Sequence, residues 1–270
     1  MTPAPTPATG RVVGRFHGAW LRVEGYWTWY RRHWLSTLYS TGLQPVLFLA
    51  AMGLGFGSQV QAGPATGGVS YLVYVAPALL VAGAAQQGVS ESSYPVLSGF
   101  KWQKDYLAVT ATPVSPGQVL GGHQIWTTLR LALSGSVYAF VALLFGAWTN
   151  AGALLVILVG VLTGLACGSL ITALAAWTFD EGQRFGLIFR FIVIPMTLFS
   201  GTFFPIAQLP LYLRWLAWIS PLWHGTELSR AATLGGHSLL PVLGHLVYLA
   251  VLVAVGWAIA HRGFYRRLVA

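Results

Sequence analysis

The sequence has 270 residues, of which 56% are hydrophobic and 8% charged, and its mean hydropathy is +0.66. This composition lies far outside the soluble globular range, so it excludes a soluble enzyme and predicts one all-α membrane domain that crosses the bilayer several times. The formal net charge of +9 fits arginines at cytoplasmic membrane edges, with attraction to membrane lipid, and no basic cluster is large enough for nucleic-acid binding. The single cysteine, Cys167, excludes a disulfide framework and a cysteine-based metal site.

The N-terminal segment divides into a tail and a helix. Residues 1–10 are rich in Pro, Thr and Ala, which is typical of a flexible tail. In residues 11–34, apolar side chains recur at alternating spacings of four and three and so share one helical stripe: Phe16, Trp20, Val23, Trp27, Tyr30 and Trp34. Arg31 and Arg32 fall largely off this stripe. The pattern indicates an amphipathic helix in the cytoplasmic headgroup layer, and we prefer this to a core helix of a soluble domain.

The remainder of the chain, residues 35–270, is predicted to be the transmembrane domain. It holds apolar runs near or above the ~20 residues needed to cross a bilayer, at 35–57, 71–91, 123–147, 151–179, 186–204 and 239–260. Six spans place both termini on one side, and most Lys and Arg residues fall on that side. The positive-inside rule therefore predicts a multi-pass protein of the cell membrane (inner or plasma) with both termini cytoplasmic.

Polar residues inside the predicted spans require protein or water around them. Gln44, Gln86 and Gln87 are candidates for a substrate path, and interhelical hydrogen bonding explains them equally well. Glu91, Arg130 and Arg190 lie near the cytoplasmic edge, where snorkelling or mutual pairing explains them better than a proton relay. The fourth predicted span carries a repeated small-residue face for close helix packing, formed by Gly160, Gly164 and Gly168.

The loop at 98–122 is the longest internal segment that cannot sit in hydrocarbon. It holds both lysines of the chain, Lys101 and Lys104, beside Asp105. The pattern predicts a short amphipathic helix over 101–110 that ends near Thr112, because the next residue is proline, and a helix restart after Pro116. Such a helix between two spans is a candidate binding site for a partner outside the membrane.

The segment at 201–236 is apolar, but prolines cut it at 205, 210 and 221. Its two helical pieces, 211–219 and 222–233, are too short to span. We predict a re-entrant helical hairpin in the outer leaflet, packed against protein. Glu227 and Arg230 are spaced to form an ion pair, and His224 is interpreted as an interfacial hydrogen-bonding residue in preference to a ligand or proton acceptor.

Taken together, these features resemble the permease subunits of ABC-2 type exporters. The similarity rests on the N-terminal amphipathic helix, on the loop run TPVSPGQVLGG, on the turn Asp180–Arg184, and on LFSGTFFPIAQLPLYLRWLAWISPLWHGTELSRAATLG before the last span. The last stretch is similar to the branch of lipo-oligosaccharide (nodulation-factor) exporters and, more distantly, to daunorubicin-type exporters. In relatives the loop often carries several charges, whereas here aromatic residues replace some of them, so its docking surface should be more apolar.

The resemblance implies a partner that supplies energy. The sequence has no G-x-x-x-x-G-K-[ST] run to cradle phosphates, so no cofactor is expected on this chain, and ATP and Mg should bind a separate ABC ATPase subunit, in two copies. A second permease, identical or paralogous, should pair with this one. The residues expected to couple to the ATPase are Lys101, Trp102, Lys104, Asp105, Tyr106, Leu107, Asp180, Glu181 and Arg184.

The resemblance further implies a path between protomers that the hairpin closes on the outer side. Candidate outer-gate residues are Phe203, Phe204, Trp223, His224 and Glu227. Aromatic residues near both interfaces and the scarcity of intramembrane charge favour an amphipathic or lipid-linked cargo, such as a glycolipid, lipo-oligosaccharide or hydrophobic drug, over an ion. The alternative is an intramembrane lipid- or glycan-modifying enzyme, for which the acidic residues are too scattered.

Overall fold

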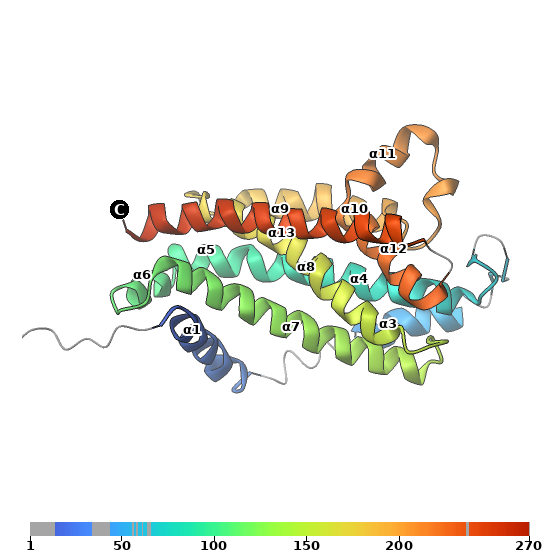
Figure 1. Ribbon diagram of the computed structural model, residues 1–270, viewed down its shortest axis with the longest axis horizontal. Helices are drawn as coiled ribbons and strands as arrows, with labels where there is room; N and C mark the ends of the chain where they lie inside the picture. The colour runs from blue at the N-terminus through green and yellow to red at the C-terminus, as the bar shows by residue number, and fades with distance from the viewer. Residues whose placement is uncertain are drawn as a thin grey trace, which may run out of the picture.

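The computed structural model of the protein describes residues 14–33, 44–55, 57, 59–60, 62–63, 66–235 and 238–269. Every regular element in these residues is a helix, which confirms the predicted all-α class. Figure 1 shows long helices running together along the longest axis of the molecule, with α8 crossing the bundle obliquely. These helices are α4 (Tyr71–Ser92) followed by α5 (Tyr94–Phe100), α7 (Pro116–Leu144), α8 (Ala153–Ala176) and α13 (Leu239–Leu268).

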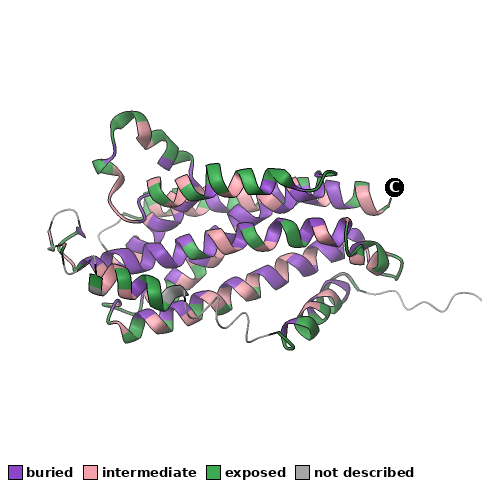
Figure 2. Cartoon of the chain, turned by 180° about the vertical axis from the view of Figure 1, so that it is seen from behind, coloured by how far each residue is buried: buried purple, intermediate pink, exposed green. Residues whose placement is uncertain are grey.

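Four helical stretches in the described residues are long and apolar enough to cross a membrane. They are α4 with α5, α7, α8 and α13, which correspond to the second, third, fourth and sixth predicted spans. In the most apolar part of α4, 78% of the residues are buried inside the protein, compared with 11% in α13. Helix α4 is therefore the central helix of the bundle, and α13 presents most of its apolar surface outward (Figure 2).

The first and fifth predicted spans are not confirmed as spans. Within 35–57 the structure describes α3 (Gln44–Leu49) and the π-helix η2 (Ala50–Gly55), and the preceding residues lie outside the described part. The fifth consists of consecutive short segments, which are α9 (Gln183–Ile188), the π-helix η5 (Phe189–Val193) and α10 (Ile194–Phe199). Pro195 has no backbone N–H, which accounts for the π-turn before it. The count of six spans remains a prediction.

Helices α4 and α8 approach each other through glycine. A Cβ atom on Gly88 would lie 2.1 Å from the backbone oxygen of Gly164, and one on Gly168 would lie 2.9 Å from the backbone oxygen of Gly88. A Cβ on Gly160 would meet the side chain of Leu80 at 2.7 Å. The predicted small-residue face is thus confirmed, and its partner is α4.

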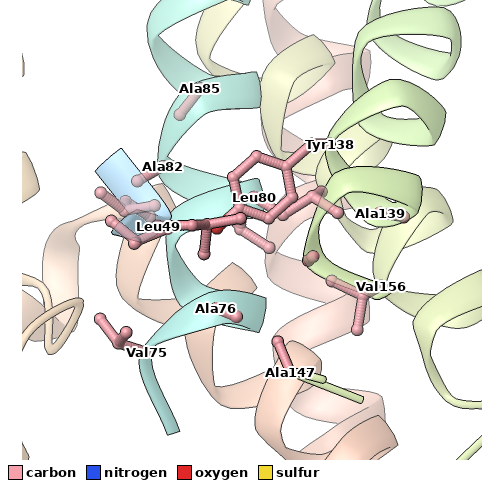
Figure 3. Close-up of a cluster of buried hydrophobic side chains, with 14 of the residues drawn as sticks. Leu49, Val75, Ala76, Leu80, Ala82, Ala85, Tyr138, Ala139, Ala147 and Val156 are labelled. Carbon is pink, nitrogen blue, oxygen red and sulfur yellow. The ribbon is translucent and has the colours of Figure 1, made fainter. Parts of the chain in front are cut away.

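The largest buried cluster joins α3, α4, α7 and α8 (Figure 3). Val75 and Val81 of α4 and Val156 of α8 are fully buried in it. The ring of Tyr138 on α7 extends toward α4 and lies beside Leu80. This cluster holds the middle and one end of the bundle together.

The opposite ends of the bundle differ. At one end lie α1 (Arg15–Tyr30), α5, α6 (Asp105–Thr110) and the C-terminus, and we call this the α6 end (Figure 1). At the other end, η6 (Ile206–Gln208) and α11 (Leu211–Ile219) project from the bundle, and α12 (Pro221–Leu234) packs back against α8 and α4. The two predicted helical pieces of the hairpin are confirmed to within a residue, whereas their depth in a membrane remains a prediction.

Local sequence explains where these helices begin. At the start of α7, the Ser115 side chain accepts a bond from the Gln118 amide at 3.3 Å, and Gln118 accepts one from the Ser115 amide at 2.7 Å. This is a capping box with Pro116 at the first helical position, as the restart after Pro116 predicted. Ser220 and Pro221 start α12 in a similar way.

The predicted helix over 101–110 is wrong at its start, because α6 begins only at Asp105. The amides of Lys101, Trp102 and Gln103 bond to the carbonyls of Leu97 and Ser98, so these residues close the end of α5. Lys104 then adopts a left-handed conformation with φ of 55° and reverses the chain into α6.

Candidate functional site

The α6 end is built on a buried cluster in which Tyr106 is 1% exposed. Its ring lies edge-on to Phe100 at 5.0 Å and contacts Phe264 of α13 at 5.5 Å. Gly99 makes room for it, since a Cβ there would lie 2.5 Å from the Tyr106 ring. Burial raises the pKa of Tyr106 well above its ordinary value, so the hydroxyl stays neutral. The sequence predicted Tyr106 as a coupling residue, and the structure places it inside the protein.

Charged partners surround this cluster. Arg22 of α1 forms an ion pair with Asp105, the first residue of α6. Lys101 lies 2.6 Å from Glu181, which also accepts a bond from the Trp102 indole at 3.2 Å. These two donors lower the pKa of the Glu181 carboxyl, the Lys101 bond most. The ion pairs tie α6 to α1 and tie the turn before it to the turn before α9.

Asp180 and Arg184, the other predicted coupling residues, define the turn before α9. Asp180 accepts a bond from the amide of Gly182 at 2.8 Å and lies 3.5 Å from Arg184. Gly182 has φ of 75°, a conformation that favours glycine. Both charged side chains remain largely exposed, so this turn is a preformed polar surface.

The predicted coupling residues therefore fall into two groups. Tyr106 is buried, while Lys101 and Asp105 are occupied by ion pairs within the chain. Trp102 and Leu107 are 48% and 44% exposed, and Lys104 is exposed beside them. The structure thus leaves Trp102, Lys104 and Leu107 on the surface of a rigidly mounted segment.

Helix α1 shows two faces. Ala19, Val23 and Tyr30 are buried against α7, where Tyr30 lies edge-on to Trp126 at 5.5 Å. The other predicted stripe residues, Phe16, Trp20 and Trp27, are 72%, 40% and 53% exposed. The helix ends at Tyr30, with Arg31 and Arg32 in the following turn and Trp34 outside the described residues. The predicted stripe is thus divided between an α7-facing edge and an open edge.

A cavity of about 430 Å³ opens between α4, α7 and the α9–α10 stretch. Gln86 and Gln87 both line it, and the Gln86 side-chain amide donates to the Thr197 hydroxyl at 3.2 Å. The hydroxyl of Tyr138 borders the cavity without a hydrogen-bond partner among the described residues. Gln44 lies in α3, but its side chain is outside the described part, and Phe48 of the same helix lines the wall.

One ion pair occupies the cavity wall. Arg130 of α7 lies 2.9 Å from Glu91 of α4, and these side chains are 17% and 20% exposed. Of the two explanations that the sequence left open, snorkelling and pairing, pairing therefore applies to Glu91 and Arg130. Because the charges cancel, the remaining polar groups of the cavity are amides and hydroxyls, contributed by Gln86, Gln87, Ser90, Ser134, Tyr138 and Thr197.

Removing one member of this pair should cost stability. In Glu91→Gln we expect a loss of about 2–3 kcal/mol, because the Arg130 guanidinium is left without its carboxylate in a partly buried site. Thermal unfolding in detergent measures the loss. The double variant Glu91→Leu/Arg130→Met should recover most of it, and a double variant less stable than Glu91→Gln would contradict the assignment.

The predicted outer-gate residues lie in two places. Phe203 lines the cavity, and its carbonyl accepts a bond from the Tyr71 hydroxyl at 3.3 Å, whereas Phe204 is half-buried nearby. Trp223 and His224 lie on α12 and pack against His245 of α13, with the two histidine Nδ1 atoms 2.7 Å apart. His224 also contacts the Trp218 carbonyl at 3.0 Å, which agrees with its predicted hydrogen-bonding role.

Glu227, the last predicted gate residue, is 3.6 Å from Arg230, which confirms the predicted pair. The structure adds that Arg230 is buried, donates to the carbonyl of Gly201 at 2.5 Å and lies over the Tyr74 ring at 4.1 Å. Arg230 therefore fixes the turn after α10 to α12 and α4. His224 and Glu227 are each bonded to a different partner, and no group of three metal ligands gathers among the described residues.

Sequence reasoning missed three residues of the α6 end: Arg22, Phe264 and Arg267. Arg267 donates to the carbonyl of Thr178 at 2.8 Å and lies over the Phe100 ring at 4.2 Å, so it closes the end of α8. Because an arginine after an apolar run already satisfies the positive-inside rule, there was no reason in the sequence to expect a structural role for Arg267. The only available signal was its position in the last turn of a helix, where cations are favoured.

Comparison with known proteins covers most of the chain. A family model described as ABC-2 type transporter matches residues 21–234. Nodulation protein J of Rhizobium leguminosarum bv. viciae is 29% identical over 256 residues, which are 92% of this chain and 95% of that protein. Nodulation protein J of Rhizobium meliloti (strain 1021) is 28% identical over 222 residues, with 80% and 81% covered. The inner membrane transport permease YadH of Escherichia coli (strain K12) is 24% identical over 262 residues, with 92% and 97% covered.

Proposed function

The chain belongs to the ABC-2 type transporter family and is an integral membrane protein, and we propose that it is the permease of an exporter powered by a separate ATPase subunit. The observation that carries this proposal is the form of the α6 end. A short helix is fixed to the bundle by a buried tyrosine and an ion pair, and Leu107 on this helix is exposed together with Trp102 and Lys104 in the turn before it. Because α6 is attached in this way, a force applied to it from outside the membrane can reach the helices of the bundle.

The ATPase would bind this open surface together with the turn at Asp180–Arg184. The bond of Lys101 and Trp102 to Glu181 joins the two surfaces into one. Because Phe100, Tyr106 and Phe264 pack together, motion of α6 would reach both α5 and α13. The permease would work as a pair, identical or paralogous, with two ATPase copies that bind ATP and Mg, and both termini would be cytoplasmic.

The cavity suggests the kind of cargo. Its wall is apolar with amide and hydroxyl groups on one side, and its charges are paired. An amphipathic molecule with an uncharged, hydrogen-bonding head fits this lining better than a cationic drug, which would require an unpaired carboxylate. Together with the similarity to the lipo-oligosaccharide exporter branch, this favours a glycolipid or lipo-oligosaccharide. The path would run through the cavity past Gln86 and Gln87, and Phe203 would close it.

Reconstitution tests the proposal. Inverted vesicles that contain this chain and its ABC ATPase partner should accumulate glycolipid only with ATP and Mg. Vesicles with the Leu107→Asp permease, which carries a charge on the exposed face, should not. Uptake without the ATPase, or equal uptake in vesicles with the wild-type and the Leu107→Asp permease, would contradict the proposal.

The enzyme alternative has a separate test. His224 and Glu227, three residues apart in the sequence, are the acid–base candidates for this alternative. If the chain is an enzyme, replacing both with alanine should abolish the catalytic activity and spare ATP-driven uptake. In the proposed transporter the same double variant should alter uptake, because both residues hold α12 in place.

A further inference from the structure

Helix α1, at the surface of the bundle, contacts α6 through the side chains of Arg22 and Tyr26. The Arg22 guanidinium pairs with Asp105, donates to the Tyr26 hydroxyl at 3.0 Å, and lies 4.2 Å and 5.2 Å from the centres of the Tyr26 and Tyr106 rings. The hydroxyls of Tyr26 and Tyr106 are 3.4 Å apart. Among the described residues, this is the only ion pair between α1 and α6. The first turn of α6 is thus bound to the middle of α1.

The remaining surface of α1 has the composition of a membrane-binding face. Phe16, Trp20 and Trp27 share one helical stripe of it and are exposed. Such aromatic side chains gain free energy when they enter the headgroup layer. In the described part of the chain, nothing covers this face.

The charge of α1 favours an anionic surface. Arg31 and Arg32 are exposed at its C-terminal end, and Glu24 is the only acidic residue in its sequence. Arg22 is already compensated by Asp105, so it does not contribute to that attraction. Each exposed arginine strengthens binding to an anionic bilayer by roughly fivefold.

The position of α1 also matters to the bundle. A Cβ on Gly122 of α7 would lie 2.6 Å from the carbonyl oxygen of Ala19, so α1 and α7 are in close backbone contact. A helix held this closely cannot shift on the membrane surface without shifting its contacts with α7 and α6. A shift of α1 caused by lipid on its exposed face would therefore move the contact with Asp105.

We infer that α1 senses anionic lipid and sets the position of α6 through the Arg22–Asp105 pair, so that transport coupling depends on the lipid composition of the membrane surface. The partner is the anionic headgroup layer, recognised by the aromatic face and by Arg31 and Arg32. The effect on coupling rests on the proposed function, whereas the link between lipid and the position of α6 does not.

A spectroscopic experiment tests the link on the permease alone. Spin labels at Ala108→Cys and Gln183→Cys, both exposed positions, report the place of α6 in a Cys167→Ala background. We expect the distance distribution to narrow when phosphatidylglycerol is added to phosphatidylcholine vesicles. With Arg22→Gln the narrowing should disappear, while Arg262→Gln, which removes an exposed charge from α13, should retain it. An identical distribution in both lipids, or a normal response by Arg22→Gln, would overturn the inference.

A transport experiment then connects the link to function. ATP-driven uptake by the complete complex should rise at least about fivefold with phosphatidylglycerol. The Arg31→Gln/Arg32→Gln variant should lose this rise, since its binding to the surface weakens by about thirtyfold. If the labels respond to lipid but no vesicle shows ATP-driven uptake, the proposed function fails and the lipid link stands. If uptake proceeds equally in both lipids, the inference fails and the proposed function stands.

Discussion

A Gly88→Ala permease should fail to fold stably. The added methyl would lie 2.1 Å from the backbone oxygen of Gly164, and a backbone atom cannot move aside as a side-chain end can. Overpacking usually costs 1–3 kcal/mol, and we expect about 3 kcal/mol or more here because two helices must separate. Since α4 is the central helix, the separation would also deform the cavity.

The unfolding temperature and the monodispersity in detergent measure this effect. Gly83→Ala is a matched control on the same helix, because no atom lies within 4 Å of its added methyl. That variant should be as stable as the parent or more so, since alanine favours helix by about 1 kcal/mol. Equal stability of the two alanine variants would show that α4 and α8 do not meet at Gly88.

The glycine contact shows what sequence patterns can predict. A repeat of small residues at every fourth position identifies a close-packing face, and the prolines at 210 and 221 fix where α11 and α12 begin. These signals are local, so they can be interpreted without knowing which helix is the packing partner. That the partner of Gly164 is Gly88 depends on packing between distant segments, which periodicity does not encode.

Helix α1 shows the same limit. Six residues share its predicted stripe, but α7 covers only one edge of it, so Val23 is buried while Phe16 is exposed. The pair of Arg22 with Asp105 joins residues 83 positions apart and has no sequence signature. Of the candidate site, sequence could therefore predict the segments and the charged turns, but not which side chains face inward.

In α6, substitutions at the neighbouring residues Tyr106 and Leu107 should impair the permease for different reasons. Tyr106→Ala should destabilise the permease by about 3–5 kcal/mol, because it removes a buried ring from contact with Phe100 and Phe264. Tyr106→Phe keeps the ring and loses only the hydroxyl near Tyr26, so its cost should stay below about 1 kcal/mol. Leu107→Asp changes an exposed side chain and should alter stability by no more than about 0.5 kcal/mol.

For ATPase affinity we expect the opposite ranking, with Leu107→Asp more harmful than Tyr106→Phe. We expect Leu107→Asp to weaken binding about thirtyfold, as for an anchor residue at the centre of an interface, while Tyr106→Phe binds normally. Unfolding temperature and ATPase affinity, measured on the same preparations, separate the two roles. If Tyr106→Phe lost affinity while Leu107→Asp kept it, Tyr106 would be a docking contact, and α6 would have to rotate when the ATPase binds. Normal results for both variants would instead place the docking surface away from α6, at the turn before α9, where Glu181 pairs with Lys101.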